Sequence, residues 1–185
     1  MDKYRLPKST IIAGKEVPFA SDFRDILYIF QILNDPDLLE HERVLLAAEN
    51  FYESDDYLED IETAVSDMME FIRGGTEEPK TSSKKPLYDW DKDYDLIVSP
   101  INRVLGKDAR GMEYLHWWTF LSAFMEIGEC TFNTFVAIRD KKNRNAKLEK
   151  WEERIYRENK DRIVLTKKVD STTQSIMDEI LGKGV

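Results

Sequence analysis

The sequence predicts a mainly α-helical protein built from two small helical subdomains, with a short β-hairpin near the N-terminus. Three observations lead to this prediction. Apolar residues recur at helical spacing through most of the 185-residue chain, two short apolar runs flank a glycine early in the sequence, and one thirteen-residue stretch in the middle lacks large apolar residues. Hydrophobic residues make up 42% of the chain, which is enough to form a folded core.

The hairpin is predicted over residues 9–19, STIIAGKEVPF. Two extended pieces lie on either side of Ala13-Gly14, where glycine can supply the positive φ angle of a tight turn. Pro18 ends the second strand or keeps it at an edge, because proline has no main-chain N–H to donate.

Helical spacing predicts three helices in the first half of the chain, over 21–34, 35–52 and 55–73. Ser21 is the expected N-cap of the first helix, and Asp35-Pro36 is the expected start of the second. The side chains predicted to be buried in the second helix are Leu38, Leu39, Leu45, Leu46 and Phe51.

The polar stretch at 76–86 is predicted to be a linker between two subdomains. Residues 1–75 then form the hairpin plus an N-terminal helical subdomain, and residues 87–168 form the C-terminal helical subdomain. The remaining residues, 169–185, form a polar tail with one amphipathic turn, which is either disordered or docked to a partner.

The second half is predicted to be helical over 88–105, 113–127, 130–141 and 146–165. Ser99-Pro100 predicts a break or a restart within the first of these helices, because proline cannot donate a helical hydrogen bond.

The segment EYLHWWTFLSAF, residues 113–124, is apolar around most of a helix. Adjacent side chains on a helix point about 100° apart, so its two tryptophans cannot form one flat stacking surface. Such a helix is central to a core, or, as the second interpretation, lies at an interface. The candidates are Tyr114, Trp117, Trp118, Leu121 and Phe124. For His116, a buried histidine satisfied by a neighbouring carboxylate or carbonyl is favoured over a catalytic base or metal ligand.

Charge is unevenly distributed along the chain. The net charge is −9 overall, but residues 139–168 carry twelve basic and six acidic residues, whereas residues 1–138 carry fourteen basic and twenty-seven acidic residues. This balance argues against general binding to nucleic acid or anionic membranes. It suits a basic partner, or head-to-tail self-association through a basic helix. The candidate assembly surface is Lys147, Lys150 and Arg154.

The sequence contains no convincing catalytic or metal-binding motif. The alternating acids from Asp89 to Asp95 resemble a calcium loop, but Tyr94 and Pro100 occupy the positions that require glycine and glutamate. Cys130 is the single cysteine, so no intrachain disulfide can form and a reducing compartment is expected. No apolar run approaches the roughly 20 residues that span a bilayer. We therefore expect no enzyme activity, no cofactor, no metal and no membrane segment.

Four sequence blocks carry a resemblance to a known family: DFRDIL at 22–27, YDWDKDYDLI at 88–97, EYLHWWTF at 113–120 and AIRDK at 137–141. Together they resemble the siphophage family labelled "bacteriophage gene product fifteen". Its members are encoded beside the tape-measure gene in phages and prophages of Gram-positive hosts. The resemblance implies a tail-assembly chaperone in the host bacterial cytoplasm, absent from the mature virion. The implied partners are the tape-measure protein and the tail-tube protein, and no catalytic residue is implied.

Three other functions remain open from the sequence. The first is a structural component or adaptor of the virion tail. The second is a small-molecule-binding domain or enzyme that uses the aromatic core near His116 as a pocket. The third is nucleic-acid binding by residues 139–168, although the acidic partners within that segment favour a solvated helix face.

Overall fold

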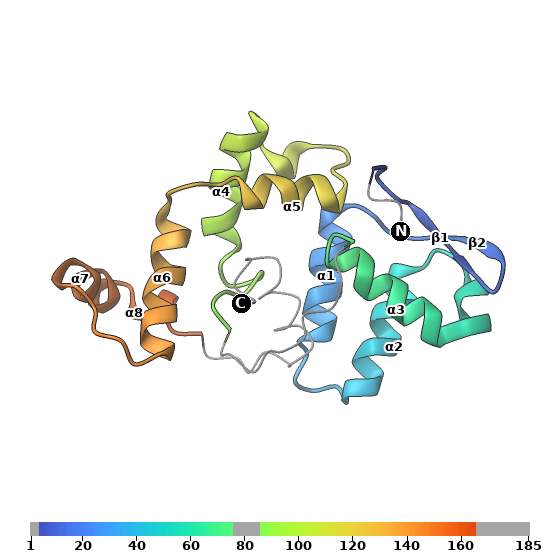
Figure 1. Cartoon of the computed structure of the whole chain (residues 1–185), viewed down its shortest axis with the longest axis horizontal. Coiled ribbons are helices and arrows are strands. Elements are labelled where there is room, and N and C mark those ends of the chain that lie inside the picture. The colour runs from blue at the N-terminus through green and yellow to red at the C-terminus, as the bar shows by residue number, and fades with distance from the viewer. Residues whose placement is uncertain (1–3, 76–85, 166–185) are drawn as a thin grey trace.

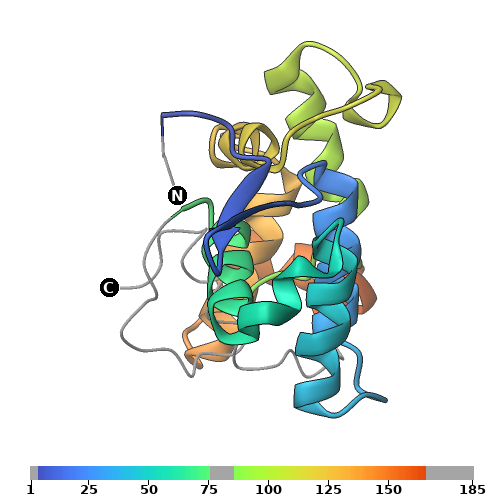
Figure 2. The same cartoon turned by 90° about the vertical axis from the view of Figure 1, so that its right-hand side faces the viewer.

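Residues 4–75 and 86–165 are described by the computed structural model. In these residues there are eight α-helices and one two-stranded sheet (Figures 1 and 2), so the predicted mainly α-helical fold is confirmed. None of these helices is long and apolar enough to cross a membrane. The predicted tail at 169–185 and nearly all of the predicted linker lie outside the described residues.

The N-terminal hairpin is confirmed. Strands β1 (Ser9–Ile12) and β2 (Lys15–Pro18) pair antiparallel, in a register that places the first residue of β1 opposite the last residue of β2. Ala13 and Gly14 connect them with positive φ angles of 49° and 81°. Positive φ at both turn residues matches the twist of the flanking strands.

Helix α1 (Phe23–Leu33) begins with Asp22, not Ser21, as its N-cap. The Asp22 carboxylate accepts the main-chain N–H of Arg24 at 3.0 Å. The hydroxyl of Ser21 is instead hydrogen-bonded to the Tyr114 hydroxyl at 2.8 Å. A long-range contact therefore takes the residue that the local pattern assigned to the cap.

Helix α2 (Glu40–Phe51) begins later than the predicted start at Asp35-Pro36. The Asp35 carboxylate accepts the N–H of Asp37 at 2.9 Å and so closes a turn. The helix starts where the Glu42 carboxylate accepts the N–H of Leu39 at 2.9 Å.

The third expected helix is divided into a 3₁₀ helix (Asp55–Asp60) and helix α3 (Ile61–Ile72). Asp60 separates them, because its carboxylate accepts the N–H of Thr63 at 3.1 Å as an N-cap. Gly74-Gly75 end α3 with positive φ angles, as the sequence predicts.

Helix α4 (Tyr94–Leu105) continues through Pro100, so the break predicted at Ser99-Pro100 is wrong. Proline here removes one helical hydrogen bond, the one to the Leu96 carbonyl. The Pro100 ring is buried, and its packing offsets part of that loss. A short 3₁₀ helix (Ala109–Gly111) follows α4.

Helix α5 (Trp117–Met125) starts later than predicted because His116 occupies its N-cap position. The His116 Nδ1 atom accepts the N–H of Trp118 at 3.0 Å. Helix α6 (Thr131–Asn143) lies close to its predicted range.

The single charged helix predicted over 146–165 is two helices, α7 (Lys150–Glu158) and α8 (Lys160–Ile163). Asn159 lies between them with φ −127° and ψ 30°, which is outside the helical region. Figure 1 shows the hairpin with α2 and α3 at one end of the molecule and α6, α7 and α8 at the other, with α1, α4 and α5 between them.

One continuous hydrophobic core includes side chains from both sides of residues 76–86. Phe23 of α1, for example, stacks on Phe120 of α5 with ring centroids 4.6 Å apart. A second, small cluster contains Phe135, Ile138, Leu148 and Ile163. The subdomain boundary at 76–86 stays a prediction, but the two halves share a core.

Candidate interaction surfaces

Trp117 and Trp118 join α5 to the end of α3. The Trp117 indole donates to the Ile72 carbonyl at 2.8 Å, and the Trp118 indole donates to the Phe71 carbonyl at 2.9 Å. Carbonyls in the last turn of a helix lack helical partners. Two adjacent tryptophans thus supply donors to two consecutive unpaired carbonyls while filling the core.

The remaining candidates from the same segment divide between core and surface. Leu121 and Phe124 are buried beside the two tryptophans, whereas Tyr114 precedes α5 and is 41% exposed. The Lys8 ammonium lies 4.4 Å from the centroid of the Tyr114 ring. Of the five candidates, Tyr114 is therefore the one that a partner can reach.

His116 is buried and fully hydrogen-bonded. Because Nδ1 accepts an N–H, the proton lies on Nε2, which donates to the Pro7 carbonyl at 2.9 Å. Burial lowers the pKa of His116, so the neutral ring is favoured. A main-chain carbonyl satisfies the histidine, which agrees with the structural interpretation favoured from the sequence.

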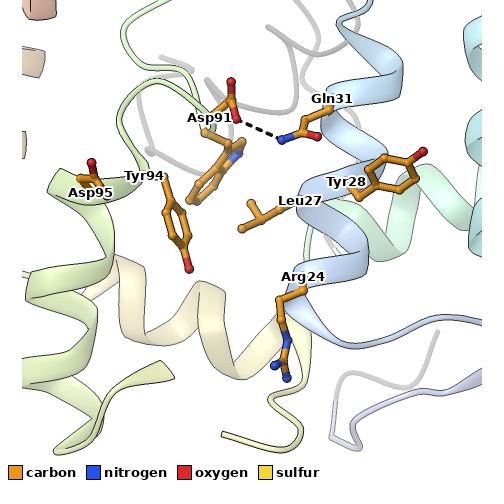
Figure 3. Close-up of a pocket in the computed structure, with 8 residues that line it drawn as sticks. Arg24, Leu27, Tyr28, Gln31, Asp91, Tyr94 and Asp95 are labelled. Carbon is orange, nitrogen blue, oxygen red and sulfur yellow. Dashed lines mark hydrogen bonds between the residues drawn. The ribbon is translucent and has the colours of Figure 1, made fainter. Parts of the chain in front are cut away.

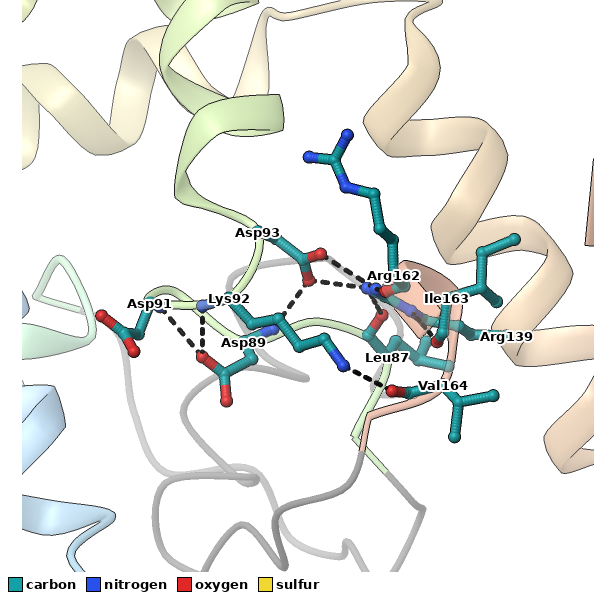
Figure 4. A network of polar contacts seen from close by, with 9 residues as sticks. All are labelled: Leu87, Asp89, Asp91, Lys92, Asp93, Arg139, Arg162, Ile163 and Val164. Atoms are coloured by element: carbon teal, nitrogen blue, oxygen red, sulfur yellow. Dashed lines mark hydrogen bonds and ion pairs between the residues drawn. The ribbon is translucent and has the colours of Figure 1, made fainter. Parts of the chain in front are cut away.

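The acidic run that resembles a calcium loop organises the start of α4 (Figure 4). The Asp89 carboxylate accepts the N–H groups of Asp91 and Lys92 at 2.9 Å each. The Asp93 carboxylate accepts the N–H of Asp89 at 3.0 Å and forms an ion pair with Arg139. In the described part of the chain, no group of three or more potential ligands could hold a metal ion.

The Asp93–Arg139 pair is buried, with side chains 1% and 4% exposed. The two bonds to Asp93 measure 2.6 and 2.9 Å. The guanidinium also donates to three main-chain carbonyls, those of Leu87, Arg162 and Ile163, at 3.0, 2.7 and 2.7 Å. These five bonds match the five N–H donors of arginine. The pair therefore fixes α8 and the segment before α4 against α6.

A pocket of ≈310 Å³ lies between α1 and the first residues of α4, and is called the α1–α4 pocket below. In Figure 3 Leu27 and Tyr94 face each other across it, and the Gln31 amide donates to the Asp91 carboxylate at 3.0 Å. Burial raises the pKa of Tyr94, so its hydroxyl stays protonated. The lining residues are Arg24, Leu27, Tyr28, Gln31, Trp90, Asp91, Tyr94 and Asp95.

The outward side of α2 carries leucines that the sequence predicted to be buried. Leu39, Leu45 and Leu46 are 61%, 51% and 37% exposed, which corrects that prediction. The buried side is made of Ala47, Ala48 and Phe51; the small alanines allow a close approach to the core, and so the larger leucines face out. The exposed residues Leu39, Glu40, Glu42, Leu45, Leu46 and Glu49 are together called the α2 leucine surface.

The predicted assembly surface lies at the opposite end of the molecule. Lys147, Lys150 and Arg154 are all exposed, and Trp151 beside them is 52% exposed. The α7 helix is held on α6 by its other side, where Lys141 contacts the two carboxylate oxygens of Glu152 at 2.7 and 2.8 Å. The four exposed residues are called the α7 basic surface.

Sequence reasoning missed the buried Asp93–Arg139 pair, the pocket and the exposure of the leucines. The ion pair joins residues 46 positions apart, so no local spacing indicates it. A signal was nevertheless present, since both partners lie inside blocks that carried the family resemblance.

The model of one family, described as bacteriophage Gp15 protein, matches residues 3–165. No curated protein and no solved structure matches the chain. The matched range includes all the described helices and both strands.

Proposed function

The chain belongs to the bacteriophage Gp15 protein family, and from this premise we propose that it is a non-enzymatic chaperone of phage tail assembly. In this role it binds the tape-measure protein, keeps it soluble and helps to recruit tail-tube subunits. It acts in the host bacterial cytoplasm and leaves before the virion is complete. The family itself indicates the coarser statement, a phage structural or assembly protein.

The observation that carries the proposal is the α2 leucine surface. Large exposed apolar patches on soluble proteins mark binding sites, because their coverage removes apolar area from water. Leu39 and Leu46 are seven residues apart and so lie on one side of the helix, two turns from each other. This length and spacing suit a helical partner that packs along α2.

The charge around these leucines selects the kind of helix. Glu40, Glu42 and Glu49 are exposed beside them, so a partner with an apolar stripe and flanking lysine or arginine is favoured. An amphipathic helix of that composition is a soluble holdase's expected client, since its apolar stripe otherwise causes aggregation.

The direct test is co-expression with the tape-measure protein of the same phage. Size-exclusion chromatography with light scattering then measures whether the two proteins leave the column as one soluble complex, and its mass gives the stoichiometry. A complex that keeps an otherwise insoluble tape-measure protein in solution is expected. The absence of a complex, with this chain detected by mass spectrometry in purified virions, contradicts the proposal and supports a structural tail component.

A matched pair of variants locates the binding site. Replacing Leu39, Leu45 and Leu46 by serine removes the apolar side chains from α2 and leaves the core unchanged. We expect affinity for the tape-measure protein to fall about thirtyfold, equivalent to about 2 kcal/mol. The control replaces Leu58 and Val104, which are 58% and 41% exposed on other elements, by serine. Equal loss in both variants contradicts a site on α2.

A further inference from the structure

The α1–α4 pocket has an unusual combination of unpaired polar groups. In the described part of the chain, two buried side-chain atoms lack a hydrogen-bond partner: Trp90 Nε1, a donor, and Asn34 Oδ1, an acceptor. Both residues line a second pocket of ≈30 Å³ that shares Leu27, Gln31, Trp90 and Asp91 with the larger one. The two unpaired atoms therefore belong to one site.

The identity of the Asn34 acceptor is fixed by its neighbour. The Asn34 Nδ2 atom donates to the Phe30 carbonyl at 2.8 Å, and a rotated amide would place two oxygens together. Trp90 is 3% exposed, so its unpaired indole N–H is costly in the free protein. A ligand that supplies one acceptor and one donor removes both deficits. A peptide group has this pair of atoms.

The charges of the pocket indicate which side chain accompanies that peptide group. Arg24 is already neutralised, because its guanidinium forms bonds of 2.7 and 2.9 Å with the Asp22 carboxylate. Lys92 points to the Val164 carbonyl at 2.6 Å. The acidic groups of the lining residues, Asp91 and Asp95, are exposed. The remaining charge is therefore negative, and it favours a cation.

We propose that the α1–α4 pocket binds an extended segment of a partner polypeptide through a lysine or arginine residue. The apolar stem of that residue lies between Leu27 and Tyr94, and its cation lies near Asp91. The adjoining peptide group bonds to Trp90 Nε1 and Asn34 Oδ1. Since Gln31 and Asp91 line both pockets, their exposed hydrogen bond opens to admit the ligand. This site is separate from the α2 leucine surface and does not depend on the proposed function.

The test uses the full chain and nuclear magnetic resonance of the tryptophan indole N–H groups. The probe is acetyl-Ala-Lys-Ala-N-methylamide, and the control probe has norleucine, which is uncharged, in place of lysine. The Trp90 signal is assigned with Trp90→Phe or, should that chain not fold, by its nuclear Overhauser contacts with Phe124, whose ring centroid is 4.9 Å away. The lysine probe is expected to shift this signal saturably.

The other indoles provide internal controls. Trp117 and Trp118 already donate to carbonyls, so their signals are expected to stay in place. Asp91→Asn keeps an acceptor for Gln31 but removes the charge, and it weakens the lysine probe about fivefold without affecting the norleucine probe. Asp161→Asn, an exposed change on α8, is the matched control. A Trp90 signal that does not move at the solubility limit of the peptide, or that responds equally to both probes, overturns the proposal.

Discussion

Replacing Arg139 by methionine tests how much the buried ion pair contributes to the fold. The substitution keeps a long apolar side chain but removes five hydrogen bonds. It leaves the Asp93 carboxylate, 1% exposed, with the N–H of Asp89 as its one remaining donor among the described contacts. Breaking a buried pair from one side costs about 3–5 kcal/mol. At about 2–4 °C per kcal/mol for a chain of this size, Tm falls by roughly 6–20 °C.

Urea unfolding followed by circular dichroism measures this loss, with three further variants. Arg144→Met makes the same change near the C-terminal end of α6, where Arg144 is 67% exposed and pairs with Asp140; its expected cost is about 0.5 kcal/mol or less. Arg139→Lys keeps the charge but not the planar fork, so its loss is intermediate. The double variant Asp93→Asn, Arg139→Met is less destabilised than the sum of the single variants, because no unpaired charge remains. A loss below about 1 kcal/mol for Arg139→Met, or strict additivity, refutes the reasoning.

Three further predictions concern the core, the buried histidine and self-association. Trp117→Ala lowers the free energy of unfolding in urea by about 3–5 kcal/mol, since it removes a fully buried side chain; a change within error contradicts its core position. The unfolded chain takes up a proton before the folded chain does, because burial lowers the pKa of His116. Stability therefore falls as the pH drops below about 6.5, and His116→Asn loses this part of the pH dependence in urea titrations; equal pH profiles contradict it. Replacing Lys147, Lys150 and Arg154 together by glutamate weakens any head-to-tail association in analytical ultracentrifugation and its salt sensitivity; unchanged sedimentation refutes a role for the α7 basic surface.

The features that the sequence predicted well are set by local interactions. The β-hairpin depends on Gly14 and the residues beside it, and the range of α6 follows from its own apolar spacing and polar ends. The apolar segment around Trp117 is also evident without a structure, because a helix apolar on most sides has to be buried.

The features that the sequence predicted poorly depend on tertiary packing. The leucines of α2 have helical spacing, but the same helix offers a second face, with Ala47 and Ala48, that packs more closely against the core. Periodicity identifies an apolar face and does not say whether that face meets the core or a partner. Pro100 is similar: propensity predicts a break, and burial of the ring overrides it.

The four sequence blocks that carry the family resemblance mainly form the joints of this fold. The Asp22 carboxylate accepts the N–H of Leu115 at 2.9 Å, which ties the first block to the third, and the Asp93–Arg139 pair ties the second to the fourth. The α2 leucine surface and the α7 basic surface lie outside all four blocks. Substitutions in the joints should therefore lower stability first, whereas substitutions on α2 should change binding at constant Tm. A surface that the fold does not use can change with its partner at little cost in stability, so the residues that select the partner are to be sought outside the blocks that define the family.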